Sequence, residues 1–340
     1  MRDEAFGPFR ADGLVPGRVV RAERGFCDVV ADGRRLRTAL APHSDDDNMT
    51  PCTGDWVAVR PPTPTVEAAV VRVLDRRTAV VRATASRNSR VQVLAANVDT
   101  VVVVASLADP ITPGRIERML ALAWESGGMP VLVLTKADRC SDVPQALSDV
   151  TAVAPGVEVV VTSAVTGDGF DALAATLRGT VVLIGPSGAG KSSLGNRLLG
   201  DEILPTNAVR ESDGKGRHTT TWRELVPLPR GGVLLDTPGL RGVGLADADD
   251  GIDTVFAEIT ELAARCRFTD CAHAGEPGCA VVAAIESGAL PRRRLDSYHR
   301  LQRENEYAAS RSDARLRAER ERRRKQISRM QRAMYRSDGR

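Results

Sequence analysis

From about residue 97 the sequence alternates short apolar runs with stretches of helical character, and this pattern constrains the fold more than any other feature. Runs such as TVVVVAS (100–106) and VVLIG (181–185) have the length of buried strands and fall far short of the roughly 18 residues that cross a bilayer. Strands that alternate with helices predict a parallel sheet covered on both faces. Ligands bind such sheets at the carboxyl ends of the strands, where the motifs of this region fall.

The region before this alternation has a different pattern. Residues 14–80 hold short strands of alternating polarity, separated by Gly, Asp and Pro turns, which predicts a small β-barrel. An OB-like barrel is the natural candidate, and such barrels often bind RNA, but an SH3-like barrel has the same periodicity. A length of 340 residues leaves room for two or three domains.

A phosphate-binding loop follows the apolar run VVLI (181–184) and opens a helix, which is the context that the motif requires. Its glycines let backbone N–H groups converge on a phosphate, Lys191 adds a charge, and the Ser192 hydroxyl can ligate Mg²⁺. A glycine-rich turn could match by chance, but the preceding strand favours the phosphate loop. The predicted phosphate-binding residues are Gly185, Pro186, Ser187, Gly188, Ala189, Gly190, Lys191, Ser192 and Ser193.

Two shorter motifs, TKAD (135–138) and TSA (162–164), select guanine. Asp138 can accept hydrogen bonds from guanine N1–H and the exocyclic amine, so a carboxylate buried there would lack partners with ATP. Lys136 would lie along the base, and the Ala164 N–H would donate to O6. Thr135 stands in place of the usual Asn, which predicts a looser brace on the phosphate loop. The predicted guanine-binding residues are Thr135, Lys136, Asp138, Thr162, Ser163 and Ala164.

Two further segments resemble the two nucleotide-dependent switches of a GTPase. In LLDTPG (234–239), Asp236 is placed to hold Mg²⁺ directly or through water, and the Gly239 N–H to sense the γ-phosphate. In GKGRHTTT (214–221), Thr220 or its neighbour Thr219 would complete the magnesium shell. A Thr pair in a loop could instead serve as a cap or turn.

The order of these motifs is unusual, because both guanine motifs precede the phosphate loop. A sheet whose ends are neighbours can be cut and rejoined without a change in its site, so we infer a circularly permuted α/β P-loop GTPase domain that binds GTP or GDP with Mg²⁺. In this order the second switch leads directly into the C-terminal region.

The C-terminal region holds a metal-binding pattern, CRFTDCAHAGEPGC. Three thiolates and an imidazole form a closed tetrahedral zinc set, with no position open for catalysis, so we expect one structural Zn²⁺ bound by Cys266, Cys271, His273 and Cys279. Free cysteines in a loop are the alternative. Six cysteines in a chain of this length argue against a disulfide framework.

Positive charge gathers at the C-terminus. Residues 291–340 hold 17 Arg and Lys against 7 Asp and Glu, although the net charge of the whole chain is only +3. This asymmetry favours a polyanionic partner, nucleic acid before membrane, although a solvated Arg-rich helix would have the same composition. The N-terminus has no apolar segment typical of a signal peptide, which predicts a cytoplasmic protein.

The permuted motifs, the barrel with its GDWVAV (54–59) and the Cys/His cluster together resemble the small ribosomal subunit biogenesis GTPase A family over about residues 14–310. The resemblance implies an N-terminal OB-fold, a permuted GTPase domain and a mainly helical C-terminal zinc-binding domain. It also implies hydrolysis of GTP to GDP and phosphate, stimulated by the 30S subunit and its 16S rRNA during late maturation. We expect a monomer, because the inferred binding surfaces face RNA.

The predicted division of the chain follows from these boundaries. It comprises an N-terminal extension (1–13), an OB-fold-like barrel (14–84), the permuted GTPase domain (85–245), a zinc-binding domain (246–310) and an Arg-rich tail (311–340).

The catalytic step needs a residue that orients water, and Leu240, where Ras-like enzymes place Gln, cannot do so. We expect slow intrinsic hydrolysis, with Lys191, Thr220 and His218 as catalytic residues and His218 turned toward the water on rRNA contact. His218 could instead stack on RNA or pack under the switch. Two rival functions remain open: a GTPase that acts on another polyanion, and an RNA-binding factor with little turnover.

Overall fold

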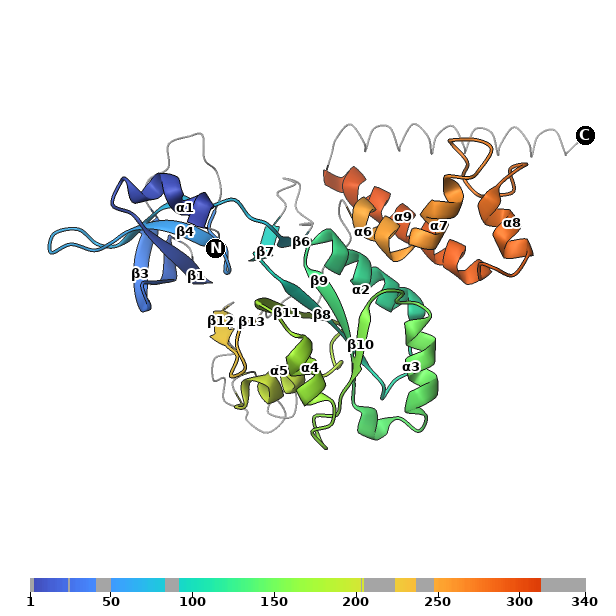
Figure 1. Cartoon of the computed structure of the whole chain (residues 1–340), viewed down its shortest axis with the longest axis horizontal. Helices are drawn as coiled ribbons and strands as arrows, with labels where there is room; N and C mark the ends of the chain where they lie inside the picture. Colours follow the sequence, from blue (N-terminus) through green and yellow to red (C-terminus); the bar gives the residue numbers. More distant parts are fainter. Residues whose placement is uncertain are drawn as a thin grey trace, which may run out of the picture. The chain divides into compact units, whose positions relative to one another are not determined.

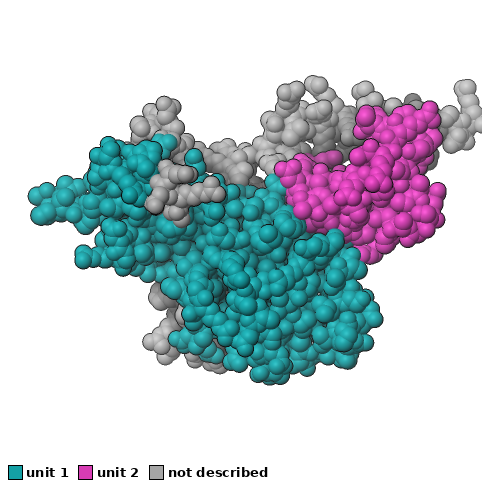
Figure 2. Space-filling view, in the orientation of Figure 1, with its two compact units in different colours: residues 1–81, 93–242 teal, residues 82–92, 243–340 magenta. Residues whose placement is uncertain are grey.

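The computed structural model describes residues 3–23, 25–40, 50–82, 92–202, 204, 224–236 and 248–312. The chain divides into two compact units, residues 1–81 with 93–242 and residues 82–92 with 243–340 (Figure 2). The first unit contains the barrel and the α/β sheet, and the second is helical (Figure 1). The finer domain boundaries given above remain predictions.

The N-terminal strands close into a five-stranded barrel. Each strand pairs with two others in the order β1-β2-β3-β5-β4, β3 runs parallel to β5, and β4 returns to β1. This order is that of an OB-like barrel, so the barrel is not the SH3-like one that the periodicity also allowed. The strands are β1 (Val15–Ala22), β2 (Phe26–Ala31), β3 (Arg34–Leu40), β4 (Trp56–Arg60) and β5 (Ala69–Val73).

The barrel interior is filled by valines from every strand except β3, and a glycine makes room for them. A Cβ atom on Gly17 would lie 2.4 Å from Val29 Cγ1 and 2.8 Å from Val59 Cγ2. Outside, helix α1 (Asp3–Arg10) packs the fully buried Phe6 against the barrel with Ala58 and Leu74. Residues of the expected N-terminal extension thus form a helix that packs on the barrel.

We predict that Gly17→Ala lowers the free energy of unfolding by about 1–3 kcal/mol, because the added methyl group overpacks the barrel. Gly7→Ala is the matched control, since its Cβ would meet nothing within 4 Å. Chemical denaturation measures both variants, and equal effects would contradict the packing argument.

The second part of this unit is a sheet of six strands in the order β10-β9-β8-β11-β13-β12. All neighbours are parallel except β12, which pairs antiparallel with β13 and, through Arg21 and Glu224, with β1 of the barrel. Figure 1 shows α2 and α3 on one side of the sheet and α4 and α5 on the other. The strands are β8 (Thr100–Ser106), β9 (Met129–Thr135), β10 (Glu158–Val161), β11 (Thr180–Ile184), β12 (Glu224–Pro227) and β13 (Val233–Asp236).

The helices of this sheet connect its strands as the alternation predicted. They are α2 (Pro113–Glu125), η1 (Ala137–Arg139), α3 (Val143–Thr151), α4 (Phe170–Thr176) and α5 (Lys191–Leu199). The expected parallel sheet is confirmed for five strands, and the antiparallel β12 is the exception.

Barrel and sheet are joined by side chains as well as by strand pairing. Strands β6 (Ala79–Arg82) and β7 (Gln92–Ala96) lie between the barrel and the sheet in the sequence, and they pair with each other. Arg18 of β1 donates to Thr180 Oγ1 (2.9 Å) and to the Asn97 carbonyl (3.3 Å), with Trp56 against its guanidinium. Burial lowers the pKa of Arg18 to about 10. Arg18 thus connects β1 directly to β11 of the six-stranded sheet.

The second unit contains four helices among its described residues, and the long α9 packs on the others. Arg294 of α9 donates to the Val255 carbonyl (2.8 Å), and the Tyr298 ring meets Phe256 edge-on. The helices are α6 (Asp249–Val255), α7 (Ala257–Ala263), α8 (Ala280–Glu286) and α9 (Arg292–Ser312). Within the described ranges, no helix is both long and apolar enough to cross a membrane.

Candidate nucleotide and metal sites

The predicted phosphate loop connects β11 to the start of α5. Gly185, Gly188 and Gly190 all have positive φ, between 81° and 154°, which side-chain-bearing residues rarely adopt. A Cβ on Gly185 would also lie 2.5 Å from the Val104 carbonyl oxygen. The glycines therefore allow a conformation in which the loop turns tightly into the helix N-terminus.

Lys191, the first residue of α5, lies back over this loop. Its Nζ donates to the Gly185 carbonyl (2.8 Å) and to the Pro186 carbonyl (2.7 Å). The ammonium group is thus held at the loop, where it would meet the oxygens of a phosphate.

Thr135 braces the phosphate loop at the end of β9. Its buried hydroxyl donates to the Ala189 carbonyl at 2.6 Å, and a Cβ on Gly190 would approach the same hydroxyl at 3.3 Å. The sequence predicted a loose brace because Thr replaces Asn. The structure shows a direct hydrogen bond between the predicted guanine motif and the phosphate loop, and whether this brace is looser than that of Asn stays a prediction.

We predict that Thr135→Val weakens the binding of both GDP and GTP by roughly 10-fold, because the near-isosteric change removes a hydrogen bond worth about 1.4 kcal/mol. Thr176→Val is the control, since that hydroxyl makes exposed hydrogen bonds far from the loop, to Glu158 Oε1 at 2.7 Å and to the Ala172 carbonyl at 3.1 Å. Titration with a fluorescent nucleotide gives both affinities. Unchanged binding in Thr135→Val would show that the brace is not needed.

The guanine motifs follow the adjacent strands β9 and β10. Lys136, in a left-handed conformation, donates from Nζ to the Gly188 carbonyl (2.7 Å), and Ser163 donates to the Asp138 carboxylate (2.5 Å). The Asp138 side chain is exposed in this structure. The reason is its place in the short helix η1, which lies beyond the end of β9 at the sheet edge.

A tight turn positions the TSA segment. The Thr162 carbonyl accepts from the Ala137 N–H (3.2 Å), the Ser163 N–H donates to the Asp168 carbonyl (3.1 Å), and a Cβ on Gly169 would lie 1.9 Å from the Val161 carbonyl oxygen. These contacts hold the two guanine motifs together.

One pocket of about 890 Å³, a volume typical of ligand sites, is lined by some of these predicted residues, whereas Asp138 is not part of its lining. Lys136 and Ala164 line one part of it, and Lys191 and Ser192 line another. Its lining also includes Val165, Ser187, Gly188, Gly190, Ser193, Asn196, Arg197, Gly200, Asp201 and Glu202. Residues from the predicted base-binding and phosphate-binding motifs therefore line one cavity.

Of the predicted switch residues, the structure describes only Asp236. Asp236 ends β13, which lies beside the phosphate-loop strand β11. His218, Thr219, Thr220 and Gly239 lie outside the described residues, as does Leu240. Their roles remain predictions.

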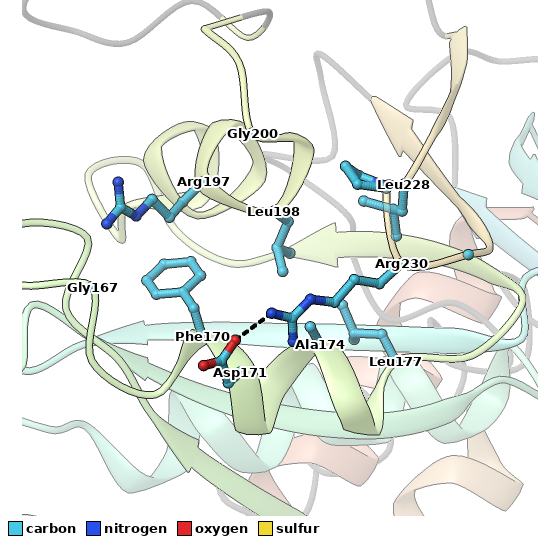
Figure 3. Close-up of a pocket in the computed structure, with 12 residues that line it drawn as sticks. Gly167, Phe170, Asp171, Ala174, Leu177, Arg197, Leu198, Gly200, Leu228 and Arg230 are labelled. Carbon is cyan, nitrogen blue, oxygen red and sulfur yellow. Dashed lines mark hydrogen bonds and ion pairs between the residues drawn. The ribbon is translucent and has the colours of Figure 1, made fainter.

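A second, smaller pocket of about 350 Å³ lies between α4, α5 and the turn from β12 to β13 (Figure 3). Phe170, Leu198 and Leu228 give it an apolar lining, and Arg230 pairs with Asp171 at its rim. The sequence analysis did not foresee this pocket, because its lining residues come from three separate segments.

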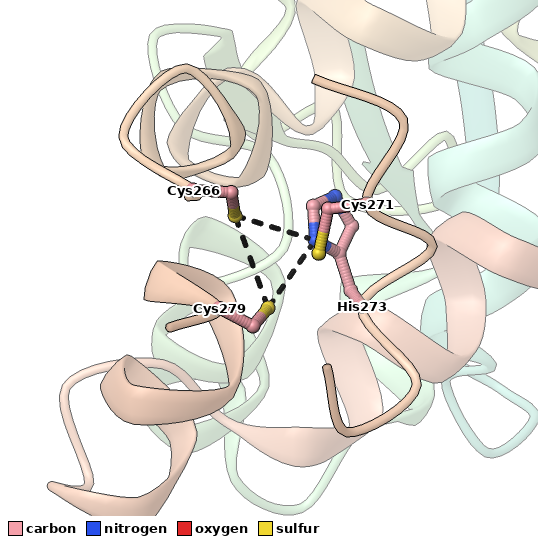
Figure 4. Close-up of side chains that lie close together, drawn as sticks. All are labelled: Cys266, Cys271, His273 and Cys279. Atoms are coloured by element: carbon pink, nitrogen blue, oxygen red, sulfur yellow. Dashed lines mark hydrogen bonds between the residues drawn. The ribbon is translucent and has the colours of Figure 1, made fainter. Parts of the chain in front are cut away.

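The four predicted metal ligands converge between α7 and α8 (Figure 4). Cys266 Sγ lies 3.8 Å from Cys279 Sγ, and His273 Nδ1 lies 3.7 Å and 3.4 Å from these two sulfurs. Zinc bonds of about 2.3 Å to sulfur and about 2.0 Å to nitrogen, in tetrahedral geometry, give edges of about 3.8 Å and about 3.5 Å. The donor atoms of Cys266, His273 and Cys279 are therefore spaced as a tetrahedral zinc site requires, and Cys271 Sγ lies within 4.8 Å of all three.

Backbone and side-chain groups support this cluster. Burial alone would raise the pKa of the Cys266 thiol, but hydrogen bonds from the Ala280 and Val281 N–H groups, together with those from Cys279 and Cys271, lower it, which favours the thiolate. Glu276 accepts hydrogen bonds from the Ala272 and Ala274 N–H groups at 3.1 and 2.8 Å. The sequence analysis missed Glu276, whose only signal is a carboxylate inside the cysteine-rich loop.

The sequence matches a family model described as RsgA GTPase over residues 73–246. A small ribosomal subunit biogenesis GTPase RsgA of Streptomyces coelicolor is 58% identical over 93% of this chain and 87% of its own. Its counterpart in Syntrophotalea carbinolica is 40% identical over 98% of this chain and 95% of its own. The relatives are thus similar over nearly their whole length.

Two solved structures are similar in fold. YjeQ of Thermotoga maritima has a TM-score of 0.65 at 27% identity, over 85% of this chain and 97% of its own. YloQ, described as a circularly permuted GTPase, has a TM-score of 0.61 at 24% identity, over 84% and 93%. These likenesses confirm the expected barrel and permuted GTPase fold, and the helical C-terminus carries the Cys/His cluster. The chain belongs to the RsgA GTPase family, a family of hydrolases that act on GTP.

Proposed function

We propose that this protein hydrolyses GTP to GDP and phosphate on the 30S ribosomal subunit during its late maturation, and that the subunit stimulates hydrolysis. The observation that carries the proposal is the single pocket lined by guanine-motif and phosphate-loop residues. The choice of partner is supported by the relatives, which are named for small ribosomal subunit biogenesis.

We assign the base to Asp138 and to the Ala164 N–H of the pocket lining, with Lys136 along the face of the base. Lys191 and the loop N–H groups would hold the phosphates. The support for this assignment is geometric, since Thr135 and Lys136 both contact the phosphate loop. The two halves of the site are thereby held at a fixed separation.

We assign Mg²⁺ to Ser192, Asp236 and Thr220 or Thr219, because hydroxyl and carboxylate oxygens suit this ion. When bound, the ion would neutralise charge on the β- and γ-phosphates. His218 would orient water when rRNA orders its segment, and Gly239 would sense the γ-phosphate. These roles follow from the motifs alone.

We assign one structural Zn²⁺ to Cys266, Cys271, His273 and Cys279. All four donor atoms lie within 4.8 Å of one another, and three thiols with one imidazole form a closed set of soft ligands. We also infer contacts with 16S rRNA, a monomeric state and a cytoplasmic location. The basic C-terminal residues support an RNA partner.

The test is GTP hydrolysis by the purified protein alone, with 30S subunits and with 50S subunits. Salt must be fixed, because binding to phosphates is strongly salt-dependent. We expect a large increase in turnover only with 30S subunits.

Equal or absent stimulation would assign the switch to another RNA or polyanion. Failure to hydrolyse GTP under any condition would favour an RNA-binding factor with little turnover.

A further inference from the structure

The surroundings of the four predicted metal ligands support them unequally. Cys279 is the N-cap of α8, and the Cys266 N–H donates to the Ala263 carbonyl at the end of α7 (3.0 Å). Cys271 and His273 instead lie in the loop between these two helices (Figure 4). His273 has a φ of 56°, in the left-handed region that residues with a side chain rarely adopt. This half of the cluster therefore needs support from within the loop.

The side chain of Glu276 provides this support. One carboxylate oxygen accepts from the Ala272 N–H at 3.1 Å, and the other accepts from the Ala274 N–H at 2.8 Å. These two amides flank His273, so one carboxylate fixes the backbone on both sides of the left-handed residue. The second oxygen also lies 3.6 Å from the Cys271 thiol. Glu276 thus contacts one predicted ligand and holds the backbone around another.

The backbone of Glu276 positions a third ligand. The Cys279 N–H donates to the Glu276 carbonyl at 3.1 Å, which closes a four-residue turn over the sequence EPGC (276–279). Proline at the second position and Gly278 at the third, with a φ of 79°, are the residues that a type II turn requires. Glu276 begins the turn that brings the chain to Cys279. Its side chain and its backbone together act on three of the four predicted ligands.

We propose that Glu276 is a positioning residue of the metal centre, because it holds the loop in the shape that presents Cys271, His273 and Cys279 to one ion. Its carboxylate is not one of the four clustered donor groups, so it acts through the loop. Ligands that are held in place lose little conformational freedom when the ion binds, and loss of such outer contacts typically weakens metal binding by about 10–100-fold. The inference rests on the proposed assignment of zinc to this cluster.

The test is a zinc titration of the full chain in competition with a chromophoric chelator. We expect Glu276→Ala to raise the Kd for zinc by about 10–100-fold. Glu276→Gln keeps an oxygen that can accept from one of the two amides, so it should recover part of this loss and bind zinc roughly 5-fold more weakly than wild type. Glu261→Ala is the matched control, since it removes an exposed acid on α7 and should leave the Kd for zinc unchanged.

Cobalt gives a second measurement, because the visible spectrum of bound Co²⁺ depends on the geometry of its ligands. We expect the bands of a tetrahedral site with three sulfurs and one nitrogen in wild type, weaker bands in Glu276→Ala and restored bands in Glu276→Gln. A general loss of stability would leave the spectrum of the bound ion unchanged.

Equal zinc affinities of Glu276→Ala and Glu261→Ala would overturn the proposal. If Glu276→Ala does not fold, Glu276→Gln carries the test, and a Kd for zinc equal to that of wild type would then overturn it. A wild-type chain that takes up no zinc would refute the zinc assignment and this inference with it. Bound zinc in wild type with an unaffected Glu276→Ala would refute this inference alone.

Discussion

Asp138→Asn is expected to weaken GTP binding by roughly 10²–10³-fold and to create a preference for xanthosine triphosphate. The carboxylate can accept two hydrogen bonds from guanine, each worth about 1.5–2 kcal/mol because the acceptor is charged, for a total of about 3–4 kcal/mol. An asparagine turns its NH₂ group toward the guanine amine, so that two donors face each other.

Xanthine reverses this mismatch. It keeps the N1–H but carries a carbonyl oxygen in place of the exocyclic amine, so asparagine can accept from the first and donate to the second. Specificity should therefore exchange, and a general loss of binding is not expected. The geometry supports this, since Ser163 donates to Asp138 (2.5 Å) and can equally donate to the side-chain oxygen of asparagine.

The measurement is a pair of titrations with GTP and xanthosine triphosphate, at fixed Mg²⁺ and salt. Asp149→Asn, an exposed acid on α3, controls for the change in charge. If Asp138→Asn lost affinity for both GTP and xanthosine triphosphate at an unchanged melting temperature, Asp138 would not contact the base. ATP should remain a poor ligand throughout, because adenine has no N1–H.

The parts of the fold that were predictable are those encoded by local pattern. The alternation of strands and helices predicted the parallel sheet, and the motif order predicted the permutation, because each motif follows a strand wherever the chain is cut. The cysteine spacing is also a local pattern and predicted the metal cluster, because a chain with closely spaced ligands can loop around one ion.

The parts that were missed depend on long-range contacts. Helix α1 contains Gly7 and Pro8, which argue against a helix, and its position comes from Phe6 buried on the barrel. Strand β12 is only four residues long, and its direction is set by pairing with β13 and β1. Sequence periodicity contains neither kind of information.

The candidate site was predictable as a set of residues but not in its internal contacts. The motifs identified Thr135, Lys136 and Asp138, yet the hydrogen bond from Thr135 to Ala189 and the exposure of Asp138 required coordinates. Asn196, which also lines the pocket, was missed because in KSSLGNRLL it is one polar residue of a helix, and its partner is the backbone of Leu204. Backbone partners leave no signature in a single sequence.

Removal of the metal is expected to destabilise the helical unit strongly and to leave nucleotide binding intact. We predict one zinc ion per purified chain, and none in Cys279→Ser. In zinc-finger peptides a structural zinc contributes about 10–16 kcal/mol to folding. If zinc contributes only about 3 kcal/mol to the stability of this unit, its removal should lower the melting midpoint by about 12–24 °C.

The loss should be partial because the unit has a core of its own. Phe256, Leu295 and Leu301 are buried at 0–1% exposure between α9 and the shorter helices. The segment from Cys266 to Cys279 has no such core, and its ligands are the groups that connect α7 to α8. We therefore expect α9 to retain helical structure after chelation while the connection between α7 and α8 loses its order.

The measurement combines metal analysis, circular dichroism melting and nucleotide titration, before and after a chelator. Cys140→Ser is the matched control, because Cys140 lies in the nucleotide-binding unit outside the cluster and should leave the zinc content at one per chain. The residues predicted to bind guanine and phosphate belong to the other compact unit, so the Kd for GDP should change less than 3-fold. A metal-free protein with an unchanged melting profile would mean that the cluster does not stabilise its helices, whereas a parallel loss of GDP binding would show that the two units fold cooperatively.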